Sequence, residues 1–396
     1  MKALSSVAQA VQASTTMAID AMYKRMRAQG QDVIGFGAGE PDFPTPEHIK
    51  SAASLAIKNN QTKYTQTAGI VELRQAVCNR LEADCGLSYT EEQIVVSSGA
   101  KHNLYAALRA LINPGDEVIL PAPYWVSYYE LIKMAGGVPV VINAAEENGF
   151  KITRQQLRGA ITIKTKLLIL NNPSNPTGMM YDKASLESIA EICDHFDLYI
   201  IADEIYYKLV YGSGTFTSFP SISEAIKERT ILISGVSKSY AMTGWRIGYA
   251  AAPTHIAKIM ANYLSHSTSA PSSVSQWAAV AALSGEQSAV EDMRKAFEVR
   301  RDYLCARMNQ MGAVSCIEPE GAFYVMMNID KLIRKELHGV VIQNADDFAQ
   351  VFLEKGLVAV VPCTGFGAPN YVRWSYATSM ENIKEGLDRL EKFLHE

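Results

Sequence analysis

Short apolar runs alternate with amphipathic stretches between about residue 90 and residue 250 of the chain. The apolar runs have the length of buried strands, and they predict strands over Ile94–Ser97, Glu117–Leu120, Val138–Ile142, Lys166–Leu170, Leu198–Ala202, Thr230–Ile233 and Ile247–Ala251. The stretches between them carry apolar residues at helical spacing, most clearly over Lys101–Ile112, Trp125–Ala135 and Lys183–His195. This alternation predicts an α/β fold with a mostly parallel sheet flanked by helices.

The pattern changes after residue 270. A long helical pattern covers residues 290–311. Strand-like segments follow at Ala322–Asn328, Leu357–Val361 and Tyr371–Ser375, before a final helix that runs to Glu396. Near the other end of the chain, the prolines at positions 41, 44 and 46 indicate a stiff crossing segment rather than a buried element. We therefore predict a large domain over residues 46–289 and a smaller α+β domain built from residues 1–45 and 290–396.

Composition and charge argue against several classes of protein. The 396 residues carry a net charge of −4, with no basic excess of the kind that binds nucleic acid. No apolar run reaches the ~18–20 residues that span a membrane. The histidines lack metal-ligand spacing, and the cysteines form no CxxC pair, which is typical of reduced thiols. These features predict a cytoplasmic enzyme without a metal site.

One lysine stands in an unusual setting. Lys238 follows the apolar run at residues 231–233, small residues surround it, and Arg246 lies eight positions further on. A catalytic amine must be open to a carbonyl ligand, and a nearby cation can hold an anionic group. The arrangement therefore fits a Schiff-base lysine with a phosphate-anchored cofactor. A surface lysine in a loop is the alternative for a lone lysine.

Other polar residues fall where strands of the predicted sheet end, which is where ligands bind in such sheets. Asp203 ends the strand at residues 198–202, Asn175 lies in the turn-rich segment 171–178, and Ser98-Gly99-Ala100 opens a predicted helix. A helix start offers free N–H groups and a favourable dipole to an anion such as phosphate. Each of these residues also has an ordinary structural explanation as a helix cap or turn residue.

Arg373 lies in the middle of an apolar strand segment, Tyr371–Ser375. An unpaired buried guanidinium is costly, so an anion is expected to meet it, either an acidic side chain or a ligand carboxylate. The glycine-rich segment Gly35–Gly39 is different from a dinucleotide-binding loop, because Glu40–Pro44 cannot open a helix.

Taken together, these motifs resemble one family. Residues 234–249, the string Asn171–Gly178, Asp203-Glu204-Ile205-Tyr206 and Gly39–Phe43 are similar to the signatures of the fold-type I, class I aminotransferases, which use pyridoxal 5'-phosphate. The motifs extend from residue 35 to residue 376, and within the family they are most similar to the bacterial-type aspartate aminotransferases. The resemblance implies the fold-type I architecture and a homodimer with shared active sites.

The resemblance also implies roles for single residues around the cofactor. Lys238 would form the Schiff base and transfer a proton, Asp203 would pair with the ring nitrogen, and Tyr206 would donate to the ring oxygen. Asn175 would bind the ring oxygen and the substrate, and Trp125 would stack on the ring. The phosphate would be held by Ser98, Gly99, Ala100, Ser237 and Arg246, and by Tyr64 from a second subunit.

Substrate residues follow in the same way. The resemblance implies that Arg373 and the backbone of Gly39 hold the substrate α-carboxylate, and that Trp125 and Asn175 also contact the substrate. Lys101 matches a lysine that meets the distal carboxylate in relatives that use acidic substrates, although its position alone suggests a solvated helix lysine.

The chain departs from the family pattern at two points. Many relatives carry a serine three residues before the lysine as a phosphate ligand, whereas this chain has Gly235. Ser234 or Ser237 is then the replacement. Some relatives that accept prephenate carry a basic residue in the N-terminal segment, where this chain has Gln12. Prephenate is therefore less expected as a substrate than aspartate.

The function implied is transfer of the amino group from L-aspartate to 2-oxoglutarate. An aminotransferase for aromatic or other amino acids and a carbon–sulfur lyase of the same fold are the alternatives. A transcriptional regulator with an aminotransferase-like domain is disfavoured, because we see no basic recognition helix before the large domain. A cofactor-binding relative without catalysis is disfavoured because every required side chain is present.

Overall fold

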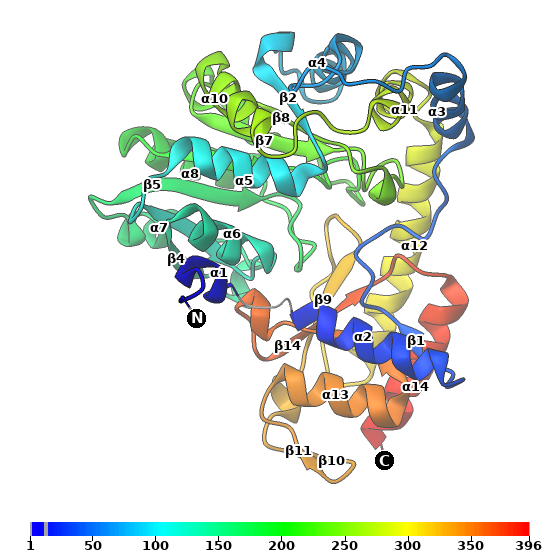
Figure 1. Cartoon of the computed structure of the whole chain (residues 1–396). Helices are drawn as coiled ribbons and strands as arrows, with labels where there is room; N and C mark the ends of the chain where they lie inside the picture. Colours follow the sequence, from blue (N-terminus) through cyan, green and yellow to red (C-terminus); the bar gives the residue numbers. More distant parts are fainter. Residues whose placement is uncertain (1, 12–14, 396) are drawn as a thin grey trace.

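The computed structural model describes residues 2–11 and 15–395 of the chain. Its main element is a seven-stranded sheet in the upper part of Figure 1, with the strand order β2-β8-β7-β6-β5-β3-β4. The strands are β2 (Ile94–Ser97), β3 (Glu117–Ala122), β4 (Val138–Asn143), β5 (Thr165–Asn171), β6 (Tyr199–Asp203), β7 (Thr230–Gly235) and β8 (Gly248–Ala251). Neighbouring strands are parallel except around β8, which is antiparallel to both β2 and β7. The mostly parallel α/β sheet predicted from the sequence is confirmed.

Alternate residues of the central strands pack against helices on opposite faces of this sheet. In β5, Leu167 and Ile169 belong to the core beneath α5 (Ala100–Leu111), α6 (Ser127–Ala135) and α10 (Thr254–Ser265). Leu168 and Leu170 belong to the core beneath α7 (Arg154–Ala160), α8 (Lys183–His195) and α9 (Glu224–Lys227). Because successive side chains of a strand point to opposite faces, a continuously apolar strand requires cover on both sides.

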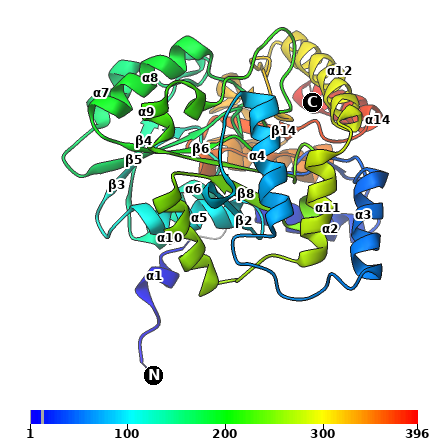
Figure 2. The ribbon, with the colours of Figure 1, turned by 90° about the horizontal axis from the view of Figure 1, so that it is seen from above.

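A further group of helices packs at the β2 edge of the sheet, as Figure 2 shows from above. It consists of α3 (Glu47–Lys58), α4 (Val71–Cys85) and α11 (Ser273–Ser284). The sequence patterns described above do not assign these helices. Among residues 2–11 and 15–395, no helix combines the length and the apolar character needed to cross a membrane.

The lower part of Figure 1 contains smaller sheets and the remaining helices. Strands β13 (Val361–Pro362), β14 (Tyr371–Ser375) and β9 (Tyr324–Asn328) form an antiparallel sheet in that order, and β10 (Glu336–Leu337) pairs with β11 (Val340–Val341). The helices are α2 (Thr15–Ala28), α12 (Ser288–Gln310), α13 (Ala345–Gly356) and α14 (Met380–His395). Strand β1 (Ile34–Gly35) pairs with β12 (Val358–Ala359) and so joins an early segment to a late one.

We call residues 46–287 the large-sheet region and residues 15–45 together with 288–395 the small-sheet region. The short helix α1 (Ser6–Gln9) lies against α6 of the large-sheet region, where Lys133 Nζ donates to Ala10 O at 2.9 Å. The domain boundaries at residues 45/46 and 289/290 stay a prediction.

Candidate active site

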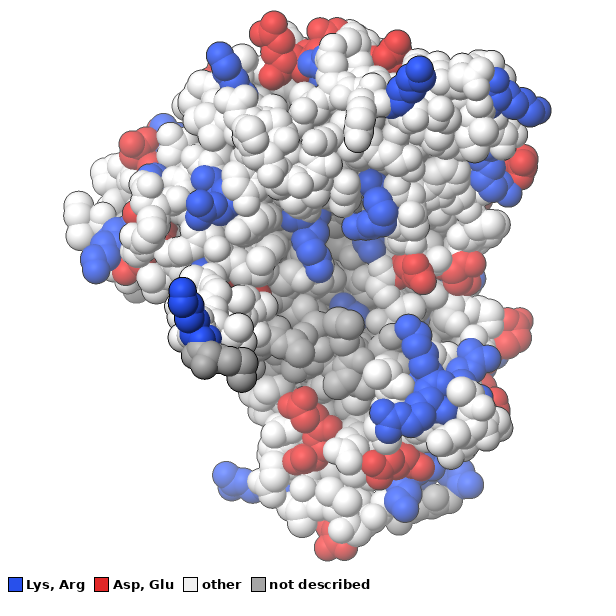
Figure 3. Space-filling model, viewed as in Figure 1, with Lys and Arg blue, Asp and Glu red and all other residues white. Residues whose placement is uncertain are grey.

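A cavity of about 690 Å³ lies between the two regions, and Figure 3 shows the molecule hollowed there. Most of the site residues predicted from the sequence line it, namely Gly39, Ala100, Lys101, Trp125, Asn175, Asp203, Tyr206, Ser237, Lys238, Arg246 and Arg373. Ser98, Gly99 and Tyr64 are not among its lining residues. Within the described part of the chain, no group of three or more His, Cys, Asp or Glu side chains could hold a metal ion.

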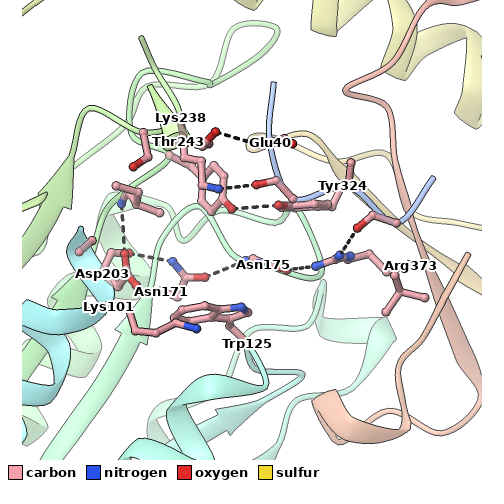
Figure 4. Close-up of a pocket in the computed structure, with 18 of the residues that line it drawn as sticks. Glu40, Lys101, Trp125, Asn171, Asn175, Asp203, Lys238, Thr243, Tyr324 and Arg373 are labelled. Carbon is pink, nitrogen blue, oxygen red and sulfur yellow. Dashed lines mark hydrogen bonds between the residues drawn. The ribbon is translucent and has the colours of Figure 1, made fainter. Parts of the chain in front are cut away.

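Lys238 lies just beyond the carboxyl end of β7 and reaches across to the small-sheet region. Its Nζ donates a hydrogen bond to the backbone oxygen of Gly39 (Figure 4). Burial lowers the pKa of Lys238 to about 8, and the positive charge of Arg373 acts in the same direction. An amine with this pKa is neutral in part of the population near physiological pH, as a nucleophile or proton carrier must be.

Asp203 ends β6 and is almost completely buried. The Tyr128 hydroxyl donates to its Oδ2 at 2.6 Å, and the Ile205 N–H donates to Oδ1 at 3.3 Å. Burial raises the pKa of Asp203 to about 6, against the lowering effect of these hydrogen bonds. Both bonded partners are neutral, so a cation placed in the cavity beside this carboxylate would relieve the cost of burying it.

A chain of amide hydrogen bonds fixes Asn175. Asn171 donates through Nδ2 to the backbone oxygen of Asp203 at 2.9 Å, and its Oδ1 accepts from the Asn175 N–H at 2.7 Å. The Asn175 side chain in turn accepts from Arg373 Nη1 at 2.9 Å. The end of β6 and the turn at Asn175 are thereby held in one arrangement (Figure 4).

Arg373 comes from β14 and is 4% exposed. Nη1 donates to Asn175, and Nη2 donates to the backbone oxygen of Gly37 at 3.1 Å, while the buried Nε has no hydrogen-bond partner among the described residues. The guanidinium carbon lies 4.3 Å from the centre of the Tyr324 ring. A buried guanidinium that is bonded to neutral oxygens and still has an unpaired N–H is suited to an incoming carboxylate.

The start of α5 and Arg246 form the other end of the cavity. Gly99 caps α5 with φ of +86°, and a methyl group added there would overlap the Arg246 guanidinium. Arg246 also donates to Thr243 O at 2.8 Å. Gly99 is therefore required for Arg246 to lie across the helix N-terminus, where the backbone N–H groups and the cation could hold an anion together.

Gly235 is closely surrounded. A Cβ at this position would lie 3.0 Å from both Gly248 Cα and Ile247 O, so a serine here would require β7 and β8 to move apart. Of the two replacement candidates, Ser237 lines the cavity, whereas the Ser234 hydroxyl donates to Glu204 O at 3.4 Å.

Lys101 lies at the first turn of α5 with its Nζ 4.7 Å from the centre of the Trp125 ring. Partial burial lowers the pKa of Lys101, and the charge of Arg246 adds to this effect. In Figure 4, Lys101 and Arg373 lie on opposite sides of Asn175. The cavity thus has a cation at each of two separated places.

Two predictions concern residues away from the cavity. The Tyr64 side chain is fully exposed and does not line the cavity of its own chain. Its contact with a second subunit stays a prediction. Gln12, which bears on prephenate use, lies outside the described residues.

Sequence reasoning did not assign Tyr128, Asn171 or Tyr324 to the site. The Tyr324 hydroxyl lies 3.1 Å from the Tyr206 hydroxyl, and Tyr324 is 1% exposed. A buried tyrosine in an apolar strand has the pattern of a core residue, so nothing in its segment distinguishes it. Asn171 lies just before Asn172-Pro173 in a polar turn, and this polar context is the sequence feature that could have indicated a role in the site.

Comparison with known proteins agrees with this geometry. Residues 31–390 match the family model described as aminotransferase class I and II. The chain belongs to this family. It is 46% identical over 381 residues to the aspartate aminotransferase of Bacillus subtilis, with 96% of each chain covered. It is 46% identical over 396 residues to the aspartate/prephenate aminotransferase of Cereibacter sphaeroides, with 99% of each chain covered.

Among solved structures, the aspartate aminotransferase of Thermus thermophilus with maleate is 41% identical to this aminotransferase. The two superpose with a TM-score of 0.93, over 99% of this chain and 100% of that chain. The resemblance on which the sequence analysis relied is confirmed at the level of the family and its fold.

Proposed function

We propose that this aminotransferase uses pyridoxal 5'-phosphate to move the amino group of L-aspartate to 2-oxoglutarate, giving oxaloacetate and L-glutamate. The observation that carries the choice of substrate is the pair of separated cations, Arg373 and Lys101, in one cavity. A four- or five-carbon dicarboxylic amino acid has an anionic group for each of them. The relatives named above are aspartate or aspartate/prephenate aminotransferases.

The residues present fit pyridoxal phosphate. The buried Asp203 carboxylate suits a protonated ring nitrogen, and the α5 N-terminus with Arg246 and Ser237 suits the phosphate. Lys238 and Tyr206 line the cavity between these two ends. Bound pyridoxal phosphate supplies an aldehyde for the substrate amine and a ring that accepts the electron pair released at the substrate α carbon.

The residues of the chain then divide the remaining work. Arg373 and Asn175 bind and orient the substrate α-carboxylate, which sets the direction of the bond to be broken at the α carbon. Lys238 Nζ would take the proton from the α carbon and deliver it to the former aldehyde carbon of the bound group, a task to which its pKa of about 8 is suited. Asp203 keeps the ring nitrogen protonated, and Tyr206 donates to the ring oxygen. Proton transfer by a positioned base contributes roughly 10²–10⁴-fold.

The Lys101 substitution tests the substrate assignment. Losing one charge-assisted contact costs about 1.5–3 kcal/mol, so kcat/KM of Lys101→Ala for aspartate should fall about ten- to a hundredfold. The rates with alanine and tyrosine should change little. Lys227→Ala is a matched control, because Lys227 also lies over an aromatic ring, 5.2 Å from the centre of Tyr89, but does not line the cavity. Equal losses for all three amino acids would mean that Lys101 is not the specificity residue, and the acidic-substrate assignment would lose its main support.

We also propose a homodimer in which Tyr64 completes the phosphate site of the partner subunit. The support is that Tyr64 is a fully exposed aromatic side chain outside its own cavity. The Tyr64→Ala and Lys238→Ala proteins, each inactive or weak alone, should regain activity when mixed and refolded, because one site of each hybrid carries both native residues. A fully active monomer in sedimentation would contradict this proposal. The cytoplasmic location stays a prediction.

A further inference from the structure

Tyr324 contacts two of the groups that the proposed mechanism uses. It is the first residue of β9, opposite Ser375 of β14, and its side chain is buried in the wall of the cavity. Its hydroxyl lies 3.1 Å from that of Tyr206, and its ring lies beneath the Arg373 guanidinium at 4.3 Å. Tyr206 follows β6 of the large-sheet region, whereas Tyr324 and Arg373, labelled in Figure 4, belong to strands of the small-sheet region.

The two hydroxyls can share only one proton in their mutual hydrogen bond. When Tyr206 donates to Tyr324, its proton is used within the wall of the cavity. When Tyr324 donates instead, the Tyr206 proton is free to point into the cavity, where the ring oxygen of the cofactor would accept it. The second arrangement satisfies both phenols, and a buried phenol without a partner is costly.

Tyr324 is itself held firmly enough to impose this direction. Its ring packs edge-on against the Tyr206 ring, with 5.8 Å between the ring centres, and on Phe323 at 4.7 Å. The Arg373 guanidinium lies over its face, a contact that favours a cation on an electron-rich ring. Next to the hydroxyl there is also little free space, since a Cβ on Gly39 would lie 3.3 Å from it.

We propose that Tyr324 is a positioning residue, whose hydroxyl donates to Tyr206 and so directs the Tyr206 proton at the ring oxygen of the cofactor. The inference rests on the proposed use of pyridoxal phosphate. Tyr324 differs from the residues assigned above, because it acts on the cofactor only through the Tyr206 side chain. The charged groups near the two phenols are Lys238, Asp203, Arg373 and Glu40, so the test must leave all four unchanged.

The test is Tyr324→Phe, which removes the hydroxyl and keeps the ring. A donor to the ring oxygen favours the form of the bound cofactor with more negative charge on that oxygen, which is the deprotonated form. Weakening this donor should move the pH-dependent transition of the cofactor's visible absorbance to higher pH. Loss of one neutral hydrogen bond corresponds to about 0.3–1 pH unit. The value of kcat should fall about two- to tenfold, with KM for aspartate nearly unchanged, because Arg373 keeps its ring contact.

Two further variants separate positioning from general damage. Tyr206→Phe should shift the same transition, and the double variant Tyr206→Phe/Tyr324→Phe should behave like Tyr206→Phe alone, because Tyr324 then has no phenol to direct. Tyr376→Phe is the matched control. It removes a buried hydroxyl of the same region that donates to Ala322 O at 3.4 Å and does not line the cavity. Its transition should stay where it is in the wild type.

The outcomes are distinct. A Tyr324→Phe transition at the wild-type pH, or shifts that add up in the double variant, would overturn the positioning role. Failure of the proposed substrate would instead appear as a wild-type enzyme that is inactive with aspartate, and the absorbance transition could still be measured on it. A wild-type protein with no visible cofactor band after addition of pyridoxal phosphate would overturn both.

Discussion

The two regions of the molecule contribute to the site in different ways. On the large-sheet side, the groups around Asp203 are bonded to one another within that side, as Tyr128 to Asp203 and Asn171 to both Asp203 and Asn175. On the small-sheet side, Arg373 is bonded to Asn175 of the other region, and its Nε has no hydrogen-bond partner in the described part of the chain. The first arrangement suits a permanent cofactor, which needs fixed groups. The second suits a substrate, which must come and go.

The comparison yields three tests, the first of which concerns the large-sheet side. Lys238→Ala should lose at least the ~10²–10⁴-fold in turnover typical of a missing general base, while still binding pyridoxal phosphate. In the wild type, borohydride treatment followed by peptide mapping should label Lys238 alone. A label on Lys101 would mean that Lys101, and not Lys238, forms the covalent link to the cofactor, and it would contradict the assignment of roles in the cavity.

The second test concerns the small-sheet side. Arg373→Lys keeps the charge but loses the planar fork, so it should weaken binding of every α-amino acid. We expect a loss of about ten- to a hundredfold in kcat/KM for aspartate, alanine and tyrosine alike. Cofactor affinity, measured by absorbance titration, should stay close to that of the wild type. If the loss were confined to aspartate, Arg373 would be the side-chain contact rather than the α-carboxylate contact.

The third and smallest effect returns to the large-sheet side. Asp203, with a pKa of about 6, takes up a proton as the pH falls through this value in the cofactor-free protein. Binding of pyridoxal phosphate should therefore weaken in acid. Because the Tyr128 hydrogen bond lowers this pKa, Tyr128→Phe should raise it and move the loss of binding to higher pH. We expect a two- to tenfold weaker affinity near pH 6 from fluorescence titration, typical of one lost hydrogen bond.

Tyr181→Phe serves as the control for that measurement. The Tyr181 hydroxyl is also buried, but it accepts from the Ile152 N–H at 3.0 Å and does not line the active-site cavity. An identical acid shift in both variants would mean that the effect is one of general stability.

The sequence alone was sufficient to identify the site residues whose chemistry is unusual for their position. Arg373 in an apolar strand and Lys238 among small residues are improbable as ordinary structure, and both line the cavity. Tyr128 and Tyr324 could not be assigned to the site from the sequence. A tyrosine is common in a protein core, and its role depends on which residue the fold places next to its hydroxyl group. Tyr324 and Tyr206 are 118 residues apart in the chain.

The fold shows the same limit. The strand at Ile247–Ala251 was predicted as one of a mostly parallel set, and β8 lies there over Gly248–Ala251 but is antiparallel. Apolar runs indicate that a strand is buried and do not indicate its direction. The direction depends on the connection from β7 over residues 236–247. Its backbone path is set by local hydrogen bonds, such as Met242 N–H to Ser237 O at 3.1 Å, and by its packing against the rest of the protein.

That short connection limits how the length of the chain can vary. The parallel strands are joined through helices, and loops at the far edge of the sheet can lengthen without moving the strand ends that carry Asn171 and Asp203. Residues 236–247 have less freedom to change in length, because they connect two neighbouring antiparallel strands in which Gly235 pairs with Gly248. Both Lys238 and Arg246 lie within this turn. An insertion there would separate Lys238 from Arg246, the residues proposed for the Schiff base and for phosphate binding. Related chains should therefore vary in length in their other loops before they vary here.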